Sequence, residues 1–569
     1  MKQFFITIVL AFLLFGTQKA QSSIYSAQSI HHPIVAKNGM VASQHKLASE
    51  IGLHILKEGG NAIDAAVGVG FALAVVLPRA GNLGGGGFMV LHDAAQNKTT
   101  TINYREMAPA KSERDMYLDK NGNVDSQKYN ASYHSVGVPG TVAGLIHALE
   151  NYGSMSLSQV LKPAIKLAEE GFPVTYDLSS VLKVYENRLK VCPETERIFY
   201  KENGFYEPGE ILIQKDLAWS LKQIAEKGRE AFYGGALGKK LSKDILKNGG
   251  IITDQDLENY KITETEPVRG TYRGYDIISM PPPSSGGVHV IQMLNILENY
   301  PLSFLGHNSA ETSHLMAETM RLAYADRSEH LGDPEFWDVP IKGLISKKYA
   351  NALASKINRY NATDSKEISA GSPADYETEE TTHFSVVDKA GNVVSNTYTL
   401  NFSFGTGLVA KGTGILLNNE MGDFSAQPGE ANAYGLIGGE ANAVEAGKRP
   451  LSSMTPTLVL KDGKLILCTG SPGGSRIIST VLQVILNVID HDMNIAEATH
   501  AHRIHHQWFP DILYYEKGFS HDTKILLAAK GHKIKQRAAM GSTQSILLRD
   551  GLIFGASDPR RPDAGTLGY

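Results

Sequence analysis

Residues 376–399 read YETEETTHFSVVDKAGNVVSNTYT, an acidic stretch that runs directly into two alternating apolar segments. Residues 382–388 and 393–399 alternate apolar with polar side chains, and Lys389-Ala390-Gly391-Asn392 separates them. Alternation with a period of two is typical of β-strands, and a short turn containing glycine and asparagine joins antiparallel strands. We therefore predict a β-hairpin that starts immediately after a polar linker.

On either side of this hairpin the chain alternates between helical and strand patterns. The preceding segment, residues 362–380, is polar and rich in carboxylates, which predicts a mobile surface linker. Strands in two groups with helices around them predict an α/β fold of stacked sheets covered by helices. Helices are expected from Val41 until Gly59-Gly60 stops the pattern, and over residues 62–77, 288–299, 477–490 and 523–530, with mainly helical sequence over 155–260. Further strands are expected at residues 88–91, 99–104, 457–460 and 465–469.

The composition excludes several classes of protein. The chain has 569 residues, of which 42% are hydrophobic and 20% charged, so it can build a large packed core and is not disordered. Its formal net charge of −4 gives no support for a nucleic-acid-binding surface. The only cysteines are Cys192 and Cys468, too few for a disulfide scaffold or a zinc ribbon, so we predict two buried thiols.

The N-terminus resembles a secretory signal. Lys2 precedes an apolar stretch, Phe4 to Gly16, that is short for a bilayer span and suits a signal peptide cleaved near Ala20. An uncleaved membrane anchor is the competing interpretation. We predict that residues 1–20 are a signal peptide and that the mature protein is exported and soluble, in a bacterial periplasm or outside the cell.

The junction between Glu380 and Thr381 has two interpretations. It is either an ordinary loop entering a strand, since threonine is common in strands, or a masked N-terminal nucleophile. If the bond before Thr381 were cut, Thr381 would gain a free α-amine. Such an amine titrates at about 7.7–8.0, so at neutral pH it can accept the proton of the residue's own hydroxyl.

Two further clusters contain groups that could take part in binding or catalysis, although each also has a simpler explanation. Ser452 and Ser453 lie in a loop bracketed by prolines, where paired hydroxyls can hold a carboxylate or merely fill a turn. Gly473 and Gly474 precede a helix, where exposed backbone N–H groups can form an oxyanion hole or belong to a plain strand-to-helix turn.

A group of histidines near the C-terminus suggests a metal site, but its spacing matches no zinc motif. The group comprises His500, His502, His505 and His506, with Asp511 nearby. No glutamate stands between helical histidine pairs, as in metalloproteases. We predict no metal and no cofactor. The chain also lacks a Gly-x-Ser-x-Gly elbow, so an α/β-hydrolase serine is not expected.

Residues 381–405 closely resemble the signature of the gamma-glutamyltranspeptidases. Five other blocks, in the order in which they occur in that family, extend the resemblance over nearly the whole mature chain. They are Gly-Asn-Leu-Gly-Gly-Gly-Gly at 81–87, Tyr-Arg-Glu-Met-Ala-Pro at 104–109, Pro-Pro-Ser-Ser-Gly-Gly at 282–287, Pro-Leu-Ser-Ser-Met at 450–454 and Gly-Ser-Pro-Gly-Gly at 470–474.

The resemblance implies a four-layer αββα N-terminal-nucleophile hydrolase fold built jointly by two subunits. The precursor would cleave itself between Glu380 and Thr381 into a large subunit, residues 21–380, and a small catalytic subunit, residues 381–569, which stay associated. Such an enzyme takes the γ-glutamyl group of glutathione or related compounds onto its threonine. It then transfers the group to water, amino acids or peptides. The expected partners are these small molecules.

The resemblance also implies roles for individual residues. Thr381 would be the nucleophile, with Thr399 bonded to it, and Gly473 and Gly474 would form the oxyanion hole. The donor's α-carboxylate would be held by a guanidinium and two hydroxyls, and its α-ammonium by oxygen acceptors. These substrate-binding residues would be Arg105, Ser452 and Ser453 for the carboxylate, and Asn401, Glu420 and Asp423 for the ammonium.

Two local features of this chain bear on those roles. Family members commonly have two acidic residues near Asp423, and Gly422 takes the place of the first here. Position 420 varies between Glu and Gln in the family, and Glu420 adds negative charge near the donor's ammonium. Residues 428–439, with Tyr434, resemble a lid loop that some members have.

Two rival functions remain at the level of the sequence. A glutaryl-type amidase, similar to the cephalosporin acylases, would need no ammonium site, so the retained Asn401, Glu420 and Asp423 argue against it. A non-catalytic exported binding protein would need neither the threonine nor the oxyanion glycines. The sequence favours the transpeptidase over both.

Overall fold

Two antiparallel seven-stranded sheets form the centre of the molecule in a computed structural model that describes residues 29–373 and 385–569. The first sheet has the order β1 (Ile34–Ala36), β20 (Leu552–Ser557), β19 (Gln544–Arg549), β15 (Lys464–Thr469), β14 (Thr457–Lys461), β9 (Tyr275–Ser279), β8 (Val268–Tyr272). The second has the order β21 (Gly565–Gly568), β2 (Met40–Ser43), β10 (Ser385–Val387), β11 (Val393–Thr399), β3 (Gly86–Asp93), β4 (Lys98–Tyr104), β7 (Thr263–Thr265).

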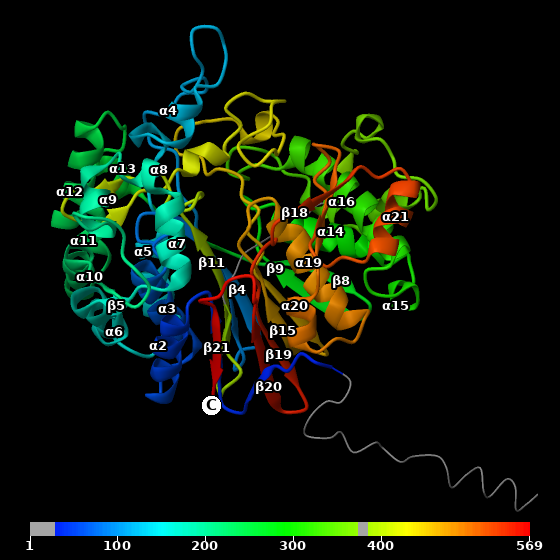
Figure 1. The fold of residues 1–569 in the computed structure, drawn as a ribbon, viewed down its shortest axis with the longest axis horizontal. Coiled ribbons are helices and arrows are strands. Elements are labelled where there is room, and N and C mark those ends of the chain that lie inside the picture. The colour runs from blue at the N-terminus through cyan, green and yellow to red at the C-terminus, as the bar shows by residue number, and fades with distance from the viewer. Residues whose placement is uncertain (1–28, 374–384) are drawn as a thin grey trace, which may run out of the picture.

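Helices cover the outer faces of both sheets, which gives the four-layer αββα arrangement (Figure 1). The helices outside the second sheet include α2 (Lys46–Lys57), α3 (Ala62–Val76), α5 (Thr141–Tyr152), α6 (Leu157–Glu170), α10 (Lys215–Lys227) and α12 (Ala236–Lys247). On the opposite side lie α14 (Gly286–Leu297), α16 (Ala310–His330), α18 (Lys347–Ala354), α19 (Arg476–Ile489), α20 (Ile495–His500) and α21 (His521–Ala529). The predicted fold class is confirmed.

Strand periodicity explains why the second sheet is buried on both faces. Along β3, Met89 and Leu91 pack into the core shared with the α3 side, whereas Phe88 and Val90 face the core shared with the other sheet. The helix α3 is buried at every position, as its largely apolar sequence predicts, and its one charged residue, Asp64, is part of the N-terminal capping box. These two cores fix β10 and β11 in the middle of the molecule, where the site is built.

Most of the predicted elements are present, with two local differences. The helix expected from Val41 begins only at Lys46, because Met40–Ser43 pairs with β10 as strand β2. The expected surface linker is not wholly exposed, since Ser365 is fully buried and donates a hydrogen bond to Asp511. Both differences arise from long-range contacts that local patterns do not contain. Among the described residues, no helix is both long and apolar enough to cross a bilayer.

Candidate active site

One cavity of about 470 Å³ collects every described residue to which the resemblance assigns a role. These residues come from strand ends and loops spread over the whole chain. They are Arg105, Thr399, Asn401, Glu420, Asp423, Ser452, Ser453, Gly473 and Gly474. Glu380 and Thr381 lie outside the described residues.

Thr399 is the last residue of β11, and the glycine-rich segment at 81–87 packs tightly against it. Thr399 pairs with Gly86 in the sheet, and its carbonyl accepts a hydrogen bond from Asn82 at 2.9 Å. A Cβ at Gly85 would lie only 1.9 Å from that carbonyl oxygen. The glycines are therefore needed for close backbone approach to the site, not for binding phosphate.

Arg105 follows β4 and is completely buried between two carboxylates. Its Nη2 donates to Asp423 Oδ2 at 2.6 Å, its Nη1 donates to Glu420, and its Nε donates to the carbonyl of Pro450. The sequence analysis assigned the arginine to a substrate carboxylate and the two acids to a substrate ammonium. In the structure, Arg105 pairs with both acids within a single ion-pair network.

One guanidinium faces three carboxyl groups in this network, and burial opposes the ionisation of two of them. Desolvation raises the pKa of Glu420 well above its usual range, against the attraction of Arg105. Glu106 Oε2 lies 3.6 Å from Arg105 Nη1, and burial raises the pKa of Glu106 to about 7. The Oε2 of Glu420 has no hydrogen-bond partner in the described part of the chain. A cationic group that entered here would find carboxylate oxygens already desolvated.

Asn401 connects Thr399 to the loop at 428–439. Its backbone has φ of +73°, and its N–H donates to Thr399 Oγ1 at 2.8 Å. Its Oδ1 accepts a hydrogen bond of 2.6 Å from the hydroxyl of Tyr434, whose ring packs edge-on against Phe402. Tyr434 thus lies over the cavity as a lid residue would, and buried carboxylates nearby help to raise the pKa of its hydroxyl, with desolvation as the main cause.

The paired serines are both buried at the cavity wall. Ser453 Oγ accepts a hydrogen bond of 3.1 Å from Arg327 on α16, and Ser452 Oγ accepts one from the N–H of Met454. The residues around Arg327 are typical of a helix and do not mark it as part of a site. It contacts Ser453 only in the folded chain, so the sequence analysis did not identify it.

Gly473 and Gly474 form the turn before α19, with φ of +142° and +59°. Among the described residues, neither of their backbone N–H groups donates to a protein acceptor. A Cβ at Gly474 would lie 2.8 Å from the ring of Tyr434. Free N–H groups that face a pocket are what an oxyanion hole requires.

The remaining wall of the cavity is strongly basic. Besides Arg105 and Arg327, the guanidinium groups at the cavity belong to Arg79, Arg188, Arg476 and Arg561. Nothing in the local sequence of these arginines marks them as neighbours. Such a surface suits substrates that carry carboxylates.

The histidines at 500–506 do not converge on one point, although His505 and His506 are both fully buried. His505 bonds to Ser479 and Gln507, His506 approaches Asp511, and His500 contacts His31. Burial lowers the pKa of His505 to about 3 and that of His506 to about 4, so both are neutral near pH 7.

Comparison with known sequences agrees with the arrangement of site residues in the cavity. The family model of the gamma-glutamyltranspeptidases matches residues 48–567. The chain is 55% identical over 544 residues to the glutathione hydrolase proenzyme of Escherichia coli strain K12, an alignment that covers 95% of this chain and 94% of that protein.

Solved structures agree as well. The gamma-glutamyltranspeptidase of Helicobacter pylori is 48% identical with a TM-score of 0.58, over 59% of this chain and 96% of the solved one. The cephalosporin acylase of Bacillus halodurans is 29% identical with a TM-score of 0.85, over 97% of this chain and 99% of the other. The fold of nearly the whole chain is therefore shared with a solved cephalosporin acylase, and that of more than half of it with a solved gamma-glutamyltranspeptidase.

Proposed function

Because the chain belongs to the gamma-glutamyltranspeptidase family, we propose that Thr381 is its nucleophile and glutathione or a similar γ-glutamyl compound its donor. The chain is a self-processing enzyme with an N-terminal-nucleophile hydrolase fold, as its proenzyme relatives are. The observation that carries the proposal is the single cavity that gathers the oxyanion glycines, the buried carboxylates and Arg105.

The position of Thr399 supports the assignment of the nucleophile. Strand β11 pairs with β10 in an antiparallel ladder and ends at Thr399, which lines the same cavity as the oxyanion glycines. The resemblance assigns to Thr399 the bond to the nucleophilic threonine. We infer that cleavage before Thr381 divides residues 21–380 from residues 381–569, and that residues 1–20 direct export of the precursor.

The reaction follows from the chemistry of these groups. The α-amine of Thr381 takes the hydroxyl proton as the oxygen attacks the γ-carbonyl, and the N–H groups of Gly473 and Gly474 stabilise the developing oxyanion. The leaving amine departs with a proton and leaves a γ-glutamyl ester on the threonine. Water or an acceptor amine then attacks that ester and regenerates the free hydroxyl.

The buried ion pairs explain how an amino acid head group would be recognised. A donor's α-ammonium and α-carboxylate carry opposite charges, so they can insert between Arg105 and its two acids without changing the net charge of the pocket. The ammonium would then bond to Glu420 and Asp423, and the guanidinium would turn to the carboxylate. Ser452 and Ser453 would supply further hydrogen bonds to that carboxylate.

A glutaryl-type acylase is disfavoured by the same pocket. A glutaryl group has no ammonium, so its binding would displace Arg105 from the buried Glu420 and the half-buried Asp423 without replacing the positive charge. The similarity to a cephalosporin acylase therefore concerns the fold rather than the substrate.

Arg105→Lys is expected to raise KM for a γ-glutamyl donor roughly ten- to a hundredfold, with less effect on kcat. Lysine keeps the charge but cannot make the planar double contact, and one charge-assisted bond contributes about 1.5–3 kcal/mol. Steady-state kinetics with a γ-glutamyl anilide measure this. Arg114→Lys, at an exposed arginine outside the cavity, is the matched control. An unchanged KM in Arg105→Lys would remove Arg105 from the substrate site.

Gly474→Ala is expected to lower kcat by about 10²–10³, the usual loss when an oxyanion donor is misplaced. The added methyl group would meet the Tyr434 ring at 2.8 Å, so the turn must shift. Gly463→Ala has comparable φ strain, with φ of +72°, in a surface turn, and it should retain the wild-type rate. Equal losses in the two variants would show that general instability, not the oxyanion turn, lowers the rate.

A further inference from the structure

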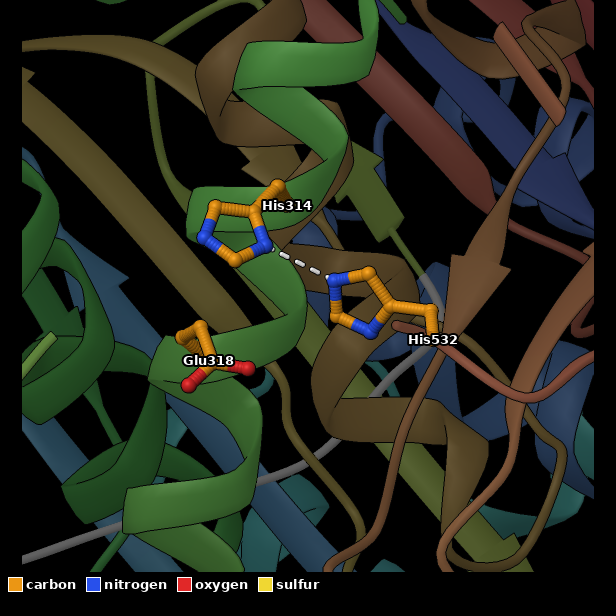
Figure 2. A group of neighbouring side chains, drawn as sticks. All are labelled: His314, Glu318 and His532. Atoms are coloured by element: carbon orange, nitrogen blue, oxygen red, sulfur yellow. Dashed lines mark hydrogen bonds between the residues drawn. The ribbon is translucent and has the colours of Figure 1, made fainter. Parts of the chain in front are cut away.

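Three buried side chains outside the cavity bring metal-ligating atoms together (Figure 2). His314, Glu318 and His532 each offer one ligand atom, and these atoms lie within 4.8 Å of one another. Their exposed fractions are 0%, 2% and 5%. We refer to them as the His-Glu-His cluster. None of the three lines the active-site cavity.

The cluster joins segments that are far apart in the sequence. His314 and Glu318 are four residues apart on α16, so they lie on the same face of that helix. His532 follows α21, and its backbone N–H bonds to the carbonyl of Leu527. Figure 2 shows the two imidazoles edge to edge with the carboxylate beside them.

Hydrogen bonds fix which nitrogen of His314 is free to bind an ion. Its Nε2 lies 2.7 Å from the carbonyl of Asn358, and because a carbonyl only accepts, this nitrogen carries the proton. Its Nδ1 therefore presents a lone pair to His532 Nε2, which lies 2.8 Å away. A ring N–H bonded to a backbone carbonyl is the usual support of a metal-binding histidine.

Hydrogen bonds also hold the carboxylate of Glu318 in place. Thr363 donates to Glu318 Oε2 at 2.6 Å, and Arg321 donates to Oε1. Arg321 also bonds to Asp511, so its charge is balanced by two acids.

We propose that His314 Nδ1, His532 Nε2 and a carboxylate oxygen of Glu318 bind one divalent transition-metal ion of the zinc class. Two imidazoles and one carboxylate are a zinc ligand set, whereas Ca²⁺ and Mg²⁺ prefer oxygen ligands alone. A tetrahedral ion would separate its two nitrogens by about 3.3 Å. The rings would move apart by about half an ångström, the proton on His532 would shift to its Nδ1, and water would complete the coordination.

The position of the cluster assigns the ion a structural role, which rests on the proposed cleavage before Thr381. His314 and Glu318 lie before that bond and His532 lies after it. Asn358 and Thr363, which bond to the cluster, also precede the bond. After cleavage the ion would hold the two chains together at a point distant from the reacting groups.

Metal binding is tested on tag-free, full-length protein that has been treated with a chelator and dialysed. Calorimetric titration with Zn²⁺ should give about one ion per precursor chain, and Co²⁺ should give the absorption spectrum of a tetrahedral site with nitrogen ligands. The melting temperature should rise with zinc concentration, since the ion binds the folded state. Wild-type protein that binds no stoichiometric zinc or cobalt would overturn the proposal.

Variants then locate the site. His532→Gln can still donate to His314 Nδ1, and Glu318→Gln keeps the shape of its side chain, yet each should weaken zinc binding at least about a hundredfold. His521→Gln, at an exposed histidine on α21, should bind like the wild type. If the folded His532→Gln and Glu318→Gln variants kept full affinity, the ion would lie elsewhere and the assignment would be wrong.

A further comparison distinguishes metal binding at the His-Glu-His cluster from the proposed function. In the cleaved wild type, zinc should raise the urea concentration at which the two chains separate on a sizing column. Zinc should also bind to Thr381→Ala, which remains one chain. Zinc binding without any cleavage in the wild type would contradict the proposed function alone. Normal cleavage without zinc binding would contradict the metal site alone.

Discussion

Thr381→Ala is expected to remain a single chain and to lose at least about 10⁴-fold in hydrolysis of a γ-glutamyl anilide. The same hydroxyl would cut the precursor and later attack the donor, so its removal abolishes both steps. Gel electrophoresis and N-terminal sequencing measure the first step. The wild type should give two chains, the smaller of which starts Thr-Thr-His at residue 381.

Thr381→Ser is the matched control because it keeps a hydroxyl at this position. It should still divide into two chains and retain part of the activity. If Thr381→Ala were cleaved at the same bond, another group would be the nucleophile of maturation, and the assignment of Thr381 would fail.

The second large effect is discrimination between γ-glutamyl and glutaryl donors, which we expect to be at least about a thousandfold in kcat/KM. A site built for a polar group rejects an analogue that lacks it by roughly 10⁴–10⁵ where nothing compensates. Here a glutaryl donor would separate Arg105 from both acids and leave the buried Glu420 and the half-buried Asp423 without a cation.

Asp423→Asn should reduce this ratio chiefly by slowing the γ-glutamyl reaction. Matched anilides of the two acids provide the measurement, in wild type and variant. Asp115→Asn, at an exposed acid paired with Arg114, should leave the ratio unchanged. Equal rates on both donors in the wild type would contradict the transpeptidase assignment and favour an acylase.

Local sequence patterns predicted most of the helices and strands that pack on one another, because the burial of each segment shows in its own residues. The alternation along residues 393–399 and the largely apolar run at 62–76 reflect burial on one or two faces, which each segment records in its own residues. The helix start at Val41 was placed wrongly because Met40–Ser43 pairs as strand β2 with β10 and β21. A strand's partner is not a local property.

The candidate site was likewise predicted only in part. The resemblance to a family supplied Arg105, Glu420 and Asp423 as a set, but it did not show that Arg105 pairs with both acids in the folded chain. It gave no sign of Arg327, and the histidine-rich segment drew attention to His500–His506 rather than to His314, Glu318 and His532. The contacts of Arg327 with Ser453 and of His314 with His532 join residues more than a hundred positions apart, so no spacing along the chain encodes them.

The sequence by itself determined the family, the layered α/β class and the identity of the groups that can react, because these depend on residue types and on periods of two or 3.6. The tertiary structure alone decided which of those groups meet, which are buried and which charges face each other. Burial and pairing set the free energy of every charge in the cavity, and both depend on neighbours that only the folded chain brings together.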